Sequence, residues 1–162
     1  MSFGRILCAI DFSEASLAAF QQAAEMARVG GGELYLLHSI EARPFVSDLI
    51  GINEMGETAV GLEEKASAAL ESLVASSASI LKGIPLNTEI TTGRAYVEVL
   101  NRARDWCADL IVLGARGATS VEQLVVGSTA EHVMKAALCS VLIVRQSGAD
   151  YLQEGKINHK AM

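Results

Sequence analysis

The sequence predicts an α/β protein in which a parallel sheet is covered by helices on both faces. Hydrophobic residues make up 51% of the 162 residues but aromatic residues only 5%, which suits alanine-rich helices packed on aliphatic strands. Short apolar runs, typical of strands buried on both faces, alternate along the chain with segments of helical periodicity. At this length we expect a single domain with a substantial core.

The first two predicted strands enclose a helix. The strands are the apolar runs from Arg5 to Ile10 and from Leu34 to Ile40. The period becomes helical from about Ser13, and the glycines at 30–32 end the helix. The residues of its apolar face are Leu17, Phe20, Ala24 and Ala27.

The same alternation resumes after a longer connection at residues 41–56. A long helix is predicted up to Lys82, and a third strand follows from Leu86 to Thr92. Gly93 then turns the chain into a helix that ends near Cys107. The apolar positions of these two helices are Leu62, Ala66, Leu70, Leu73 and Leu81 in the first, and Tyr96, Val97, Leu100 and Ala103 in the second.

The C-terminal part supplies the last two strands. Asp109 to Leu113 and Val141 to Val144 are predicted strands, with a helix from about Ser128 to Ala137 between them. Five strands with four intervening helices indicate a parallel sheet, since crossover connections are nearly always right-handed. We expect residues 1–146 to form the domain and residues 147–162 to form a polar tail.

Composition and charge exclude several classes of protein. The net charge of −6 argues against an extended nucleic-acid surface. The longest apolar runs are too short to span a membrane, and the N-terminus lacks the features of a signal peptide. The sequence therefore predicts a cytoplasmic protein with neither nucleic acid nor membrane as a partner.

The cysteines indicate neither disulfides nor a metal site. Cys8, Cys107 and Cys139 are widely separated and lie among apolar neighbours, so we expect reduced thiols that act as small hydrophobic side chains. The chain has no Cys-x2-Cys pair and no paired histidine spacing, so no metal site is expected.

A glycine motif follows the fourth predicted strand and has the properties of a phosphate-binding loop. Gly114, Gly117 and the step Gly127-Ser128 form the pattern Gly-x2-Gly-x9-Gly-Ser, which leads from a buried strand into a helix. Glycines permit tight turns and close approach to a ligand, and a helix N-terminus attracts anions. The chain carries neither G-x-x-x-x-G-K-[ST] nor the G-x-G-x-x-G of a dinucleotide fold after its first strand.

The loops after the first and fourth strands are expected at the same rim of the sheet. Ligands of such sheets bind at the carboxyl ends of the strands, where the strand order reverses. Asp11 ends the first strand and Gly114 ends the fourth. If these strands are neighbours, the two loops form one crevice.

Three segments resemble the universal stress protein family: Ile10-Asp11-Phe12-Ser13, Leu36 to Ile40, and Asp109 to Gly114 with the glycine motif that follows. The resemblance runs from about Gly4 to Arg145. It implies a three-layer sandwich with a five-stranded parallel sheet of order 3-2-1-4-5, the adenine nucleotide alpha-hydrolase-like fold, and a dimer formed through the last strand. In that family, the glycine motif marks the members that bind ATP.

The resemblance also implies an ATP site. Asp11 would contact the ribose, Ala9 and Ile10 would line the pocket, and the main chain of Ile40 would contact the adenine edge. The residues that would border the ribose and α-phosphate are Leu113, Gly114, Arg116 and Gly117. Those that would hold the β- and γ-phosphates are Gly127, Ser128 and Thr129. Where relatives often carry Gly-x-Pro, this chain has Gly93-Arg94-Ala95, and we expect this departure not to touch the pocket.

Each of these residues also has a structural explanation. Asp11 with Glu14, and Ser128 with Glu131, match capping boxes at helix starts. The glycines suit a long strand-to-helix loop, and His38 suits a hydrogen-bonded core residue. The apolar residues of the 41–56 connection fit a flap over the adenine or ordinary loop packing.

The sequence predicts an ATP-binding protein of the stress response or of signalling, with Mg²⁺ or Mn²⁺ bridging the phosphates and slow hydrolysis at most. AMP is the alternative ligand. No base or phosphate-binding lysine is placed for efficient phosphoryl transfer. Two alternatives are a dimeric scaffold with a vestigial pocket and an adenylyl-transferring enzyme. The second normally has an S-G-G-x-D-S loop after strand one, where this chain has Asp11-Phe12-Ser13-Glu14.

The last strand predicts a homodimer. Val141 to Val144 is short, apolar and last in the expected sheet, so it forms an exposed edge unless it is paired. Pairing with the same strand of a second copy would remove both edges.

Overall fold

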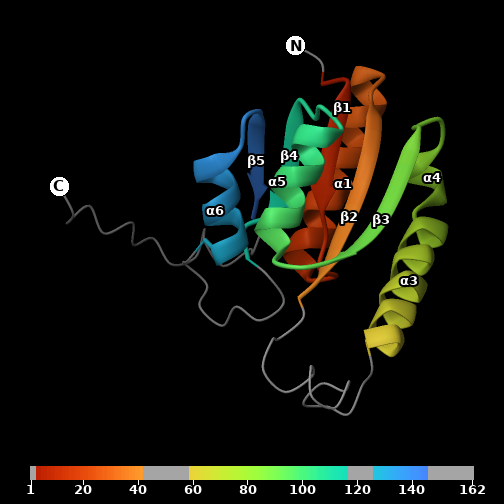
Figure 1. The fold of residues 1–162 in the computed structure, drawn as a ribbon. Coiled ribbons are helices and arrows are strands. Elements are labelled where there is room, and N and C mark those ends of the chain that lie inside the picture. Colours follow the sequence, from red (N-terminus) through yellow and green to blue (C-terminus); the bar gives the residue numbers. More distant parts are fainter. Residues whose placement is uncertain (1–2, 42–58, 117–125, 146–162) are drawn as a thin grey trace, which may run out of the picture.

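A computed structural model describes residues 3–41, 59–116 and 126–145 and confirms the predicted five-stranded parallel sheet. The strand order β3-β2-β1-β4-β5 is the order that the family resemblance implies, and β1 lies between β2 and β4 (Figure 1). The strands are β1 (Arg5–Ala9), β2 (Glu33–Ile40), β3 (Leu86–Thr92), β4 (Leu110–Gly114) and β5 (Ser140–Val144).

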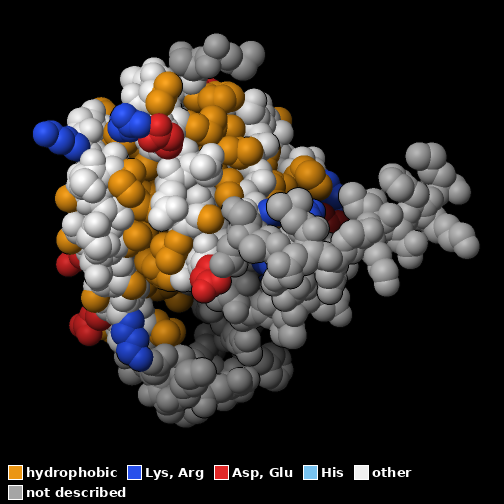
Figure 2. Space-filling model, turned by 180° about the vertical axis from the view of Figure 1, so that it is seen from behind, with side chains coloured by type: hydrophobic (Ala, Val, Ile, Leu, Met, Phe, Trp, Pro, Cys, Tyr) orange, Lys and Arg blue, Asp and Glu red, His pale blue; other side chains and the backbone are white. Residues whose placement is uncertain are grey.

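Helices cover both faces of this sheet and complete the three layers. The helices are α1 (Glu14–Gly30), α3 (Ala59–Ser76), α4 (Ala78–Leu81), α5 (Ala95–Asp105) and α6 (Ser128–Ala136). One core cluster joins the sheet to α1, α3 and α4, and a second joins its other face to α5 and α6 (Figure 1). Figure 2 views the molecule from behind, where hydrophobic side chains are spread over the surface among a few charged ones.

Alternation along the strands distributes their side chains between the two core clusters. In β1, Ile6 and Cys8 belong to the cluster with α1, whereas Leu7 faces α5 and α6. All three are completely buried. This two-sided burial explains why the strands are continuous apolar runs in the sequence.

The predicted long helix of residues 62–82 is interrupted. It is divided into α3 and α4 at Ser77, whose backbone φ of −102° and ψ of 12° depart from helical values. Ser76 contributes to the break, since its hydroxyl donates to the carbonyl of Leu73. Serine side chains that form hydrogen bonds to the nearby backbone compete with the regular helical pattern. The spacing of apolar residues does not reveal this local effect.

The cysteines match the expectation in part. Cys8 is buried in the core, and burial raises the pKa of its thiol well above the ordinary value. Cys139 is half-buried, and burial raises its thiol pKa as well. Cys107 is exposed, so its expected role as a small hydrophobic side chain is wrong. It follows α5 in a left-handed conformation with φ of 55°, which turns the chain back towards β4.

Within the described ranges, no helix is long and apolar enough to cross a membrane. The polar tail expected at residues 147–162, and nearly all of the 41–56 connection, lie outside the described residues.

Gly114 brings the end of β4 against the start of α1. A Cβ atom added at Gly114 would lie 2.7 Å from the carbonyl carbon of Ala15 and 2.8 Å from the backbone nitrogen of Ser16. Both atoms belong to the backbone of the first turn of α1, so they cannot be displaced by a side-chain rotation. This close approach requires glycine and fixes the β4 end beside the segment that follows β1.

Gly114→Ala is therefore expected to lower the free energy of unfolding by about 1–3 kcal/mol, because the first turn of α1 must shift to admit the methyl group. Urea unfolding followed by circular dichroism measures the change. Gly4→Ala is the matched control, since a Cβ there would meet Asp109 Oδ2 at 3.5 Å, an ordinary contact distance. Equal stability of both variants and the wild type would contradict the packing argument.

Candidate functional site

A pocket of about 560 Å³ lies at the carboxyl ends of the strands, at the lower edge of the sheet in Figure 1. The loops that follow β1, β2 and β4 and the first turns of α5 and α6 all contribute to it. The residues predicted from the sequence that line it are Ala9, Ile10, Asp11, Ile40, Leu113, Gly114, Arg116, Gly127, Ser128 and Thr129. Gly117 lies outside the described residues.

The segment after β1 places a carboxylate in this pocket. The Oδ1 atom of Asp11 accepts hydrogen bonds from the backbone N–H of Ser13, at 3.0 Å, and from the Ser13 hydroxyl. Ser13, not Asp11, is the N-cap of α1, because its hydroxyl oxygen accepts from the N–H of Ser16. The predicted Asp11–Glu14 capping box is therefore wrong. The helix starts two residues later than such a box requires.

Phe12 adopts a strained conformation next to Asp11. Its φ of 63° is in the left-handed region, which a bulky residue rarely adopts. Its ring lies 4.9 Å, centroid to centroid, from the ring of His38 on β2. Strain of this kind persists only where the surrounding structure holds it, and it is frequent at functional sites.

His38 is hydrogen-bonded, as expected, but it also lines the pocket. Its Nδ1 atom lies 2.8 Å from the carbonyl oxygen of Ile10, which assigns a proton to Nδ1 because the carbonyl can only accept. The side chain is half-buried and belongs to the pocket wall. The hydrogen bond links the ends of β1 and β2 at the rim of the sheet.

The start of α6 forms one end of the pocket. Gly127 is the N-cap residue, and its N–H donates to the carbonyl of Ala115 at 2.7 Å. Ser128 is the first helical residue and makes no capping hydrogen bond, so its predicted capping box with Glu131 is wrong. The N-terminus of a helix carries a partial positive charge and N–H groups without intrahelical acceptors. Its position in the pocket wall therefore favours an anion there.

The end of β2 and the start of α5 form the opposite end. The carbonyl of Ile40 accepts from the N–H of Gly93 at 3.0 Å, and the Ser39 hydroxyl donates to the carbonyl of Gly93 at 2.9 Å. The Oε1 atom of Glu41 accepts from the N–H of Ala95 at 3.2 Å. Ala95 lines the pocket, so the expectation that the Gly93-Arg94-Ala95 departure does not touch it is wrong.

Sequence reasoning missed several lining residues, chiefly on this side. They are Ser16, Leu37, His38 as a pocket residue, Ser39, Glu41, Ala95, Val99, Ala115 and Ala130. Ala95 and Val99 were detectable in principle, because the helix after β3 begins at the same rim as the other loops. Val99 lies three residues after Tyr96 and four before Ala103, so the helical periodicity places it on the face that meets the sheet.

The charged residues of the pocket are unevenly distributed. Asp11 and Glu41 bring carboxylates from the ends of β1 and β2, whereas Arg116 brings a guanidinium from the segment after β4. Among the residues that the structure describes, no group of three or more His, Cys, Asp or Glu side chains could hold a metal ion. The pocket therefore has its guanidinium on the β4 side of β1 and its carboxylates at the ends of β1 and β2, with Glu41 near the start of α5.

Comparison with known proteins agrees with this architecture. The sequence model of the Universal stress protein family matches residues 2–145. Universal stress protein YxiE of Bacillus subtilis is 32% identical over 149 residues, which cover 88% of this chain and 99% of that protein. Universal stress protein MJ0531 of Methanocaldococcus jannaschii is 31% identical over 147 residues, covering 89% of this chain and 83% of the relative.

Solved structures share the fold. Protein MJ0577 of Methanocaldococcus jannaschii superposes with a TM-score of 0.78 at 26% identity, covering 92% of this chain and all 100% of that chain. The universal stress protein of Archaeoglobus fulgidus in complex with dAMP has a TM-score of 0.63 at 21% identity, with 89% and 99% of the two chains covered. A universal stress protein in complex with cAMP has a TM-score of 0.64 at 20% identity, with 91% and 100% covered.

The family model spans nearly the whole described domain, and the relatives align over most of their own length. The strand order and the glycine motif after β4 agree with the resemblance seen in the sequence. The chain belongs to the universal stress protein family.

Proposed function

We propose that this protein binds ATP in the pocket at the rim of the sheet and acts in the cytoplasm as a nucleotide-dependent module of stress response or signalling. The observation that carries the proposal is the polarity of one pocket. The first turn of α6 lines it on one side of β1, and the acidic side chains of Asp11 and Glu41 line it from the ends of β1 and β2.

The phosphates belong at the α6 end in this proposal. The first turn of α6, with Ser128 and Thr129 in the pocket wall, offers backbone N–H groups, two hydroxyls and the positive end of the helix dipole. Arg116 adds a cation on the same side of β1. Since the whole chain has a net charge of −6, the attraction of phosphate depends on these local groups.

The nucleoside belongs between β1 and β2. Neighbouring strands lie about 5 Å apart, so the ends of β4 and β2, on either side of β1, are separated by roughly 10 Å. Apolar side chains of Ala9, Leu37 and Val99 line the pocket, and Asp11 can accept hydrogen bonds from ribose hydroxyls. The volume of about 560 Å³ is typical of a small-molecule site.

Two proteins of the same fold bind adenine nucleotides, dAMP in one and cAMP in the other, which supports an adenine nucleotide as the ligand class. Their likeness to this chain is one of fold, so the choice of ATP rests on the pocket itself. The extended anion-binding surface of the α6 start suits a polyphosphate better than a single phosphate. AMP is the alternative ligand.

A divalent cation would be held mainly by the ligand. The described residues offer no protein-only metal cage, and Mg²⁺ commonly binds through one or two protein oxygens together with substrate phosphates. Ser128 and Thr129 offer side-chain oxygen atoms at the α6 end, and Asp11 offers a carboxylate from the end of β1. Hydrolysis is expected to be slow, because the described lining residues from β4 and α6 include no carboxylate or imidazole that could orient a water, and Asp11 would be engaged by the ribose and the cation.

Ser128→Asp tests the position of the phosphates. The new carboxylate would oppose the β- and γ-phosphates and lower the affinity for ATP by about tenfold or more, with a smaller loss for AMP. It should not harm the helix, since an acidic residue in the first turn interacts favourably with the helix dipole. Isothermal titration with ATP and AMP measures both affinities.

Asn101→Asp is the matched control for this variant. It makes the same change in charge at an exposed position of α5 outside the pocket wall. ATP affinity that is unchanged in Ser128→Asp, or lowered equally in both variants, would contradict the phosphate position. Wild-type protein with no affinity for ATP or AMP below millimolar concentration would favour the dimeric scaffold with a vestigial pocket.

We also propose that the protein is a homodimer paired through β5. This strand is an edge of the sheet, and residues 141–144 are half-buried apolar side chains. Nearby, Leu138 is 93% exposed and Met134 54% exposed. A second copy of β5 would pair the open edge and cover these side chains.

Val141→Pro is expected to convert the dimer into a monomer. The Val144 carbonyl accepts from Ala115, on the β4 side, so by strand alternation the N–H of Val141 points to the open edge. Proline removes that outward donor while leaving the β4–β5 hydrogen bonds in place. Light scattering at micromolar concentration gives the mass. Val141→Ala, which keeps the N–H, should remain dimeric, and a monomeric wild type would refute the proposal.

A further inference from the structure

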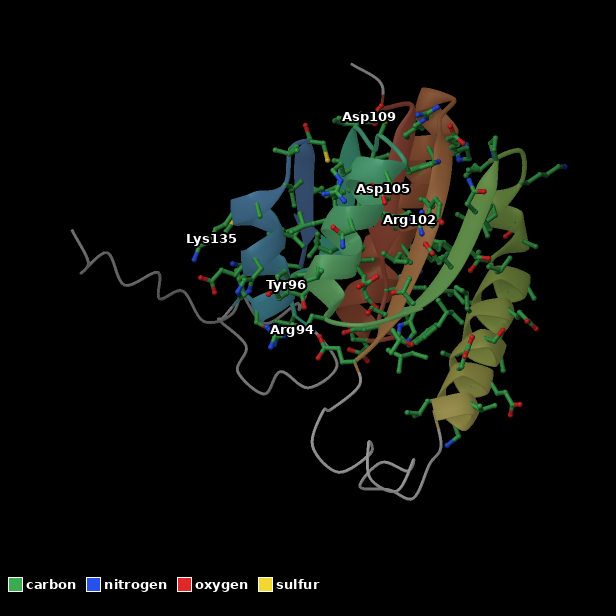
Figure 3. All side chains as sticks on the ribbon, in the orientation of Figure 1. Arg94, Tyr96, Arg102, Asp105, Asp109 and Lys135 are labelled. Carbon is green, nitrogen blue, oxygen red and sulfur yellow. The ribbon has the colours of Figure 1, made fainter. Side chains whose placement is uncertain are left out.

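Glu41 is held at the acidic end of the pocket by the first residue of α5. Its Oε1 atom accepts from the N–H of Ala95 at 3.2 Å, and both residues line the pocket. Arg94 and Tyr96, labelled in Figure 3, flank Ala95 and mark the start of α5 at the lower edge of the sheet. A carboxylate on the N-terminal turn of a helix is also stabilised by the helix dipole.

This arrangement depends on the residue at position 95. A proline at this position would have no N–H to donate. With Ala95 in its place, the donor exists and the carboxylate of Glu41 is anchored by it. This interaction at the wall of the pocket therefore requires a residue with a backbone N–H at position 95.

The other polar groups on this side already have partners. The carbonyl of Ile40 accepts from Gly93, and the hydroxyl of Ser39 donates to the carbonyl of Gly93. The hydrogen bond to Ala95 uses one oxygen of Glu41, and an ionised carboxylate has about four acceptor positions and no donor. This side of the pocket therefore presents a strong acceptor to a ligand.

We propose that Glu41 is a specificity-determining residue whose carboxylate accepts a hydrogen bond from the exocyclic amino group of adenine. The inference rests on the proposed function, with the phosphates at α6 and the ribose beside Asp11. The base then extends towards β2, and its 6-amino group, at the edge remote from the ribose, meets Glu41. That amino group is the hydrogen-bond donor of the adenine ring.

The test compares AMP with purine riboside 5′-monophosphate, which lacks the 6-amino group and is otherwise identical. The wild type should bind AMP at least about tenfold more tightly than purine riboside 5′-monophosphate, as expected for a hydrogen bond to a charged acceptor. Glu41→Ala should bring the two affinities within about twofold of each other. Glu41→Gln, which keeps a neutral acceptor, should show an intermediate ratio. Glu64→Gln, an exposed position on α3, is the charge-matched control and should keep the wild-type ratio.

Ala95→Pro provides a second variant that removes the anchor without touching Glu41. Proline is well tolerated at the first position of a helix, and the preceding residue, Arg94, already has an extended conformation with ψ of 123°. The fold should therefore be retained, as thermal unfolding would show. The preference for AMP should fall several-fold, because the carboxylate is no longer held in place.

The outcomes separate this inference from the proposed function. A wild type that binds both nucleotides equally well, or an AMP preference that survives in Glu41→Ala, would overturn the role of Glu41 and leave nucleotide binding intact. A wild type that binds neither AMP nor ATP would overturn both. A preference lost in Glu41→Ala and kept in Glu64→Gln would establish the contact.

Discussion

The close approach of β4 to the first turn of α1 is the constraint on which the site depends. Gly114 lies where an added Cβ would be 2.7 Å from backbone carbon and 2.8 Å from backbone nitrogen of α1. This contact holds the end of β4 beside the Asp11–Ser13 segment, which leads from β1 into α1. The two loops thereby share one pocket instead of forming separate turns. The absence of a side chain at position 114 therefore allows the packing that brings the two loops of the candidate site together.

The polarity of the pocket follows from the topology. Because β1 lies between β2 and β4, the anion-attracting start of α6 and the acidic residues Asp11 and Glu41 are spread along one rim. A ligand that is anionic at one end and donates hydrogen bonds at the other matches this arrangement, and a nucleotide has that form. A helix terminus and a few side chains produce this polarity, although the chain has a net charge of −6.

The sequence predicted the elements well where burial determined the pattern. The apolar runs of β1, β2 and β4 and the helical periodicities of α1, α5 and α6 correspond closely to the observed boundaries. Parallel pairing followed from the alternation of strands and helices, and the order of the strands from the family resemblance. The glycine motif predicted which loops would lie near the pocket, because glycine is required where backbones approach closely.

Local hydrogen bonding explains most of the errors. The cap of α1 is Ser13 and not Asp11, since both polar residues can cap a helix and their spacing alone does not decide between them. At α6 the backbone N–H of Gly127 bonds to Ala115, so Gly127 takes the cap position and Ser128 lies inside the helix. The break at Ser77 has the same origin. Ala95 was misjudged because its contribution is a backbone N–H, which no side-chain pattern reveals. The roles of the pocket residues in binding stay predictions.

A crystal structure of the protein grown with ATP would show where each part of the nucleotide binds. We expect phosphate oxygens within hydrogen-bond distance of the backbone N–H groups at the start of α6, the ribose beside Asp11, and the adenine towards Ile40 and Glu41. Density for the nucleotide in the opposite orientation, or a pocket without nucleotide at millimolar ATP, would contradict this expectation.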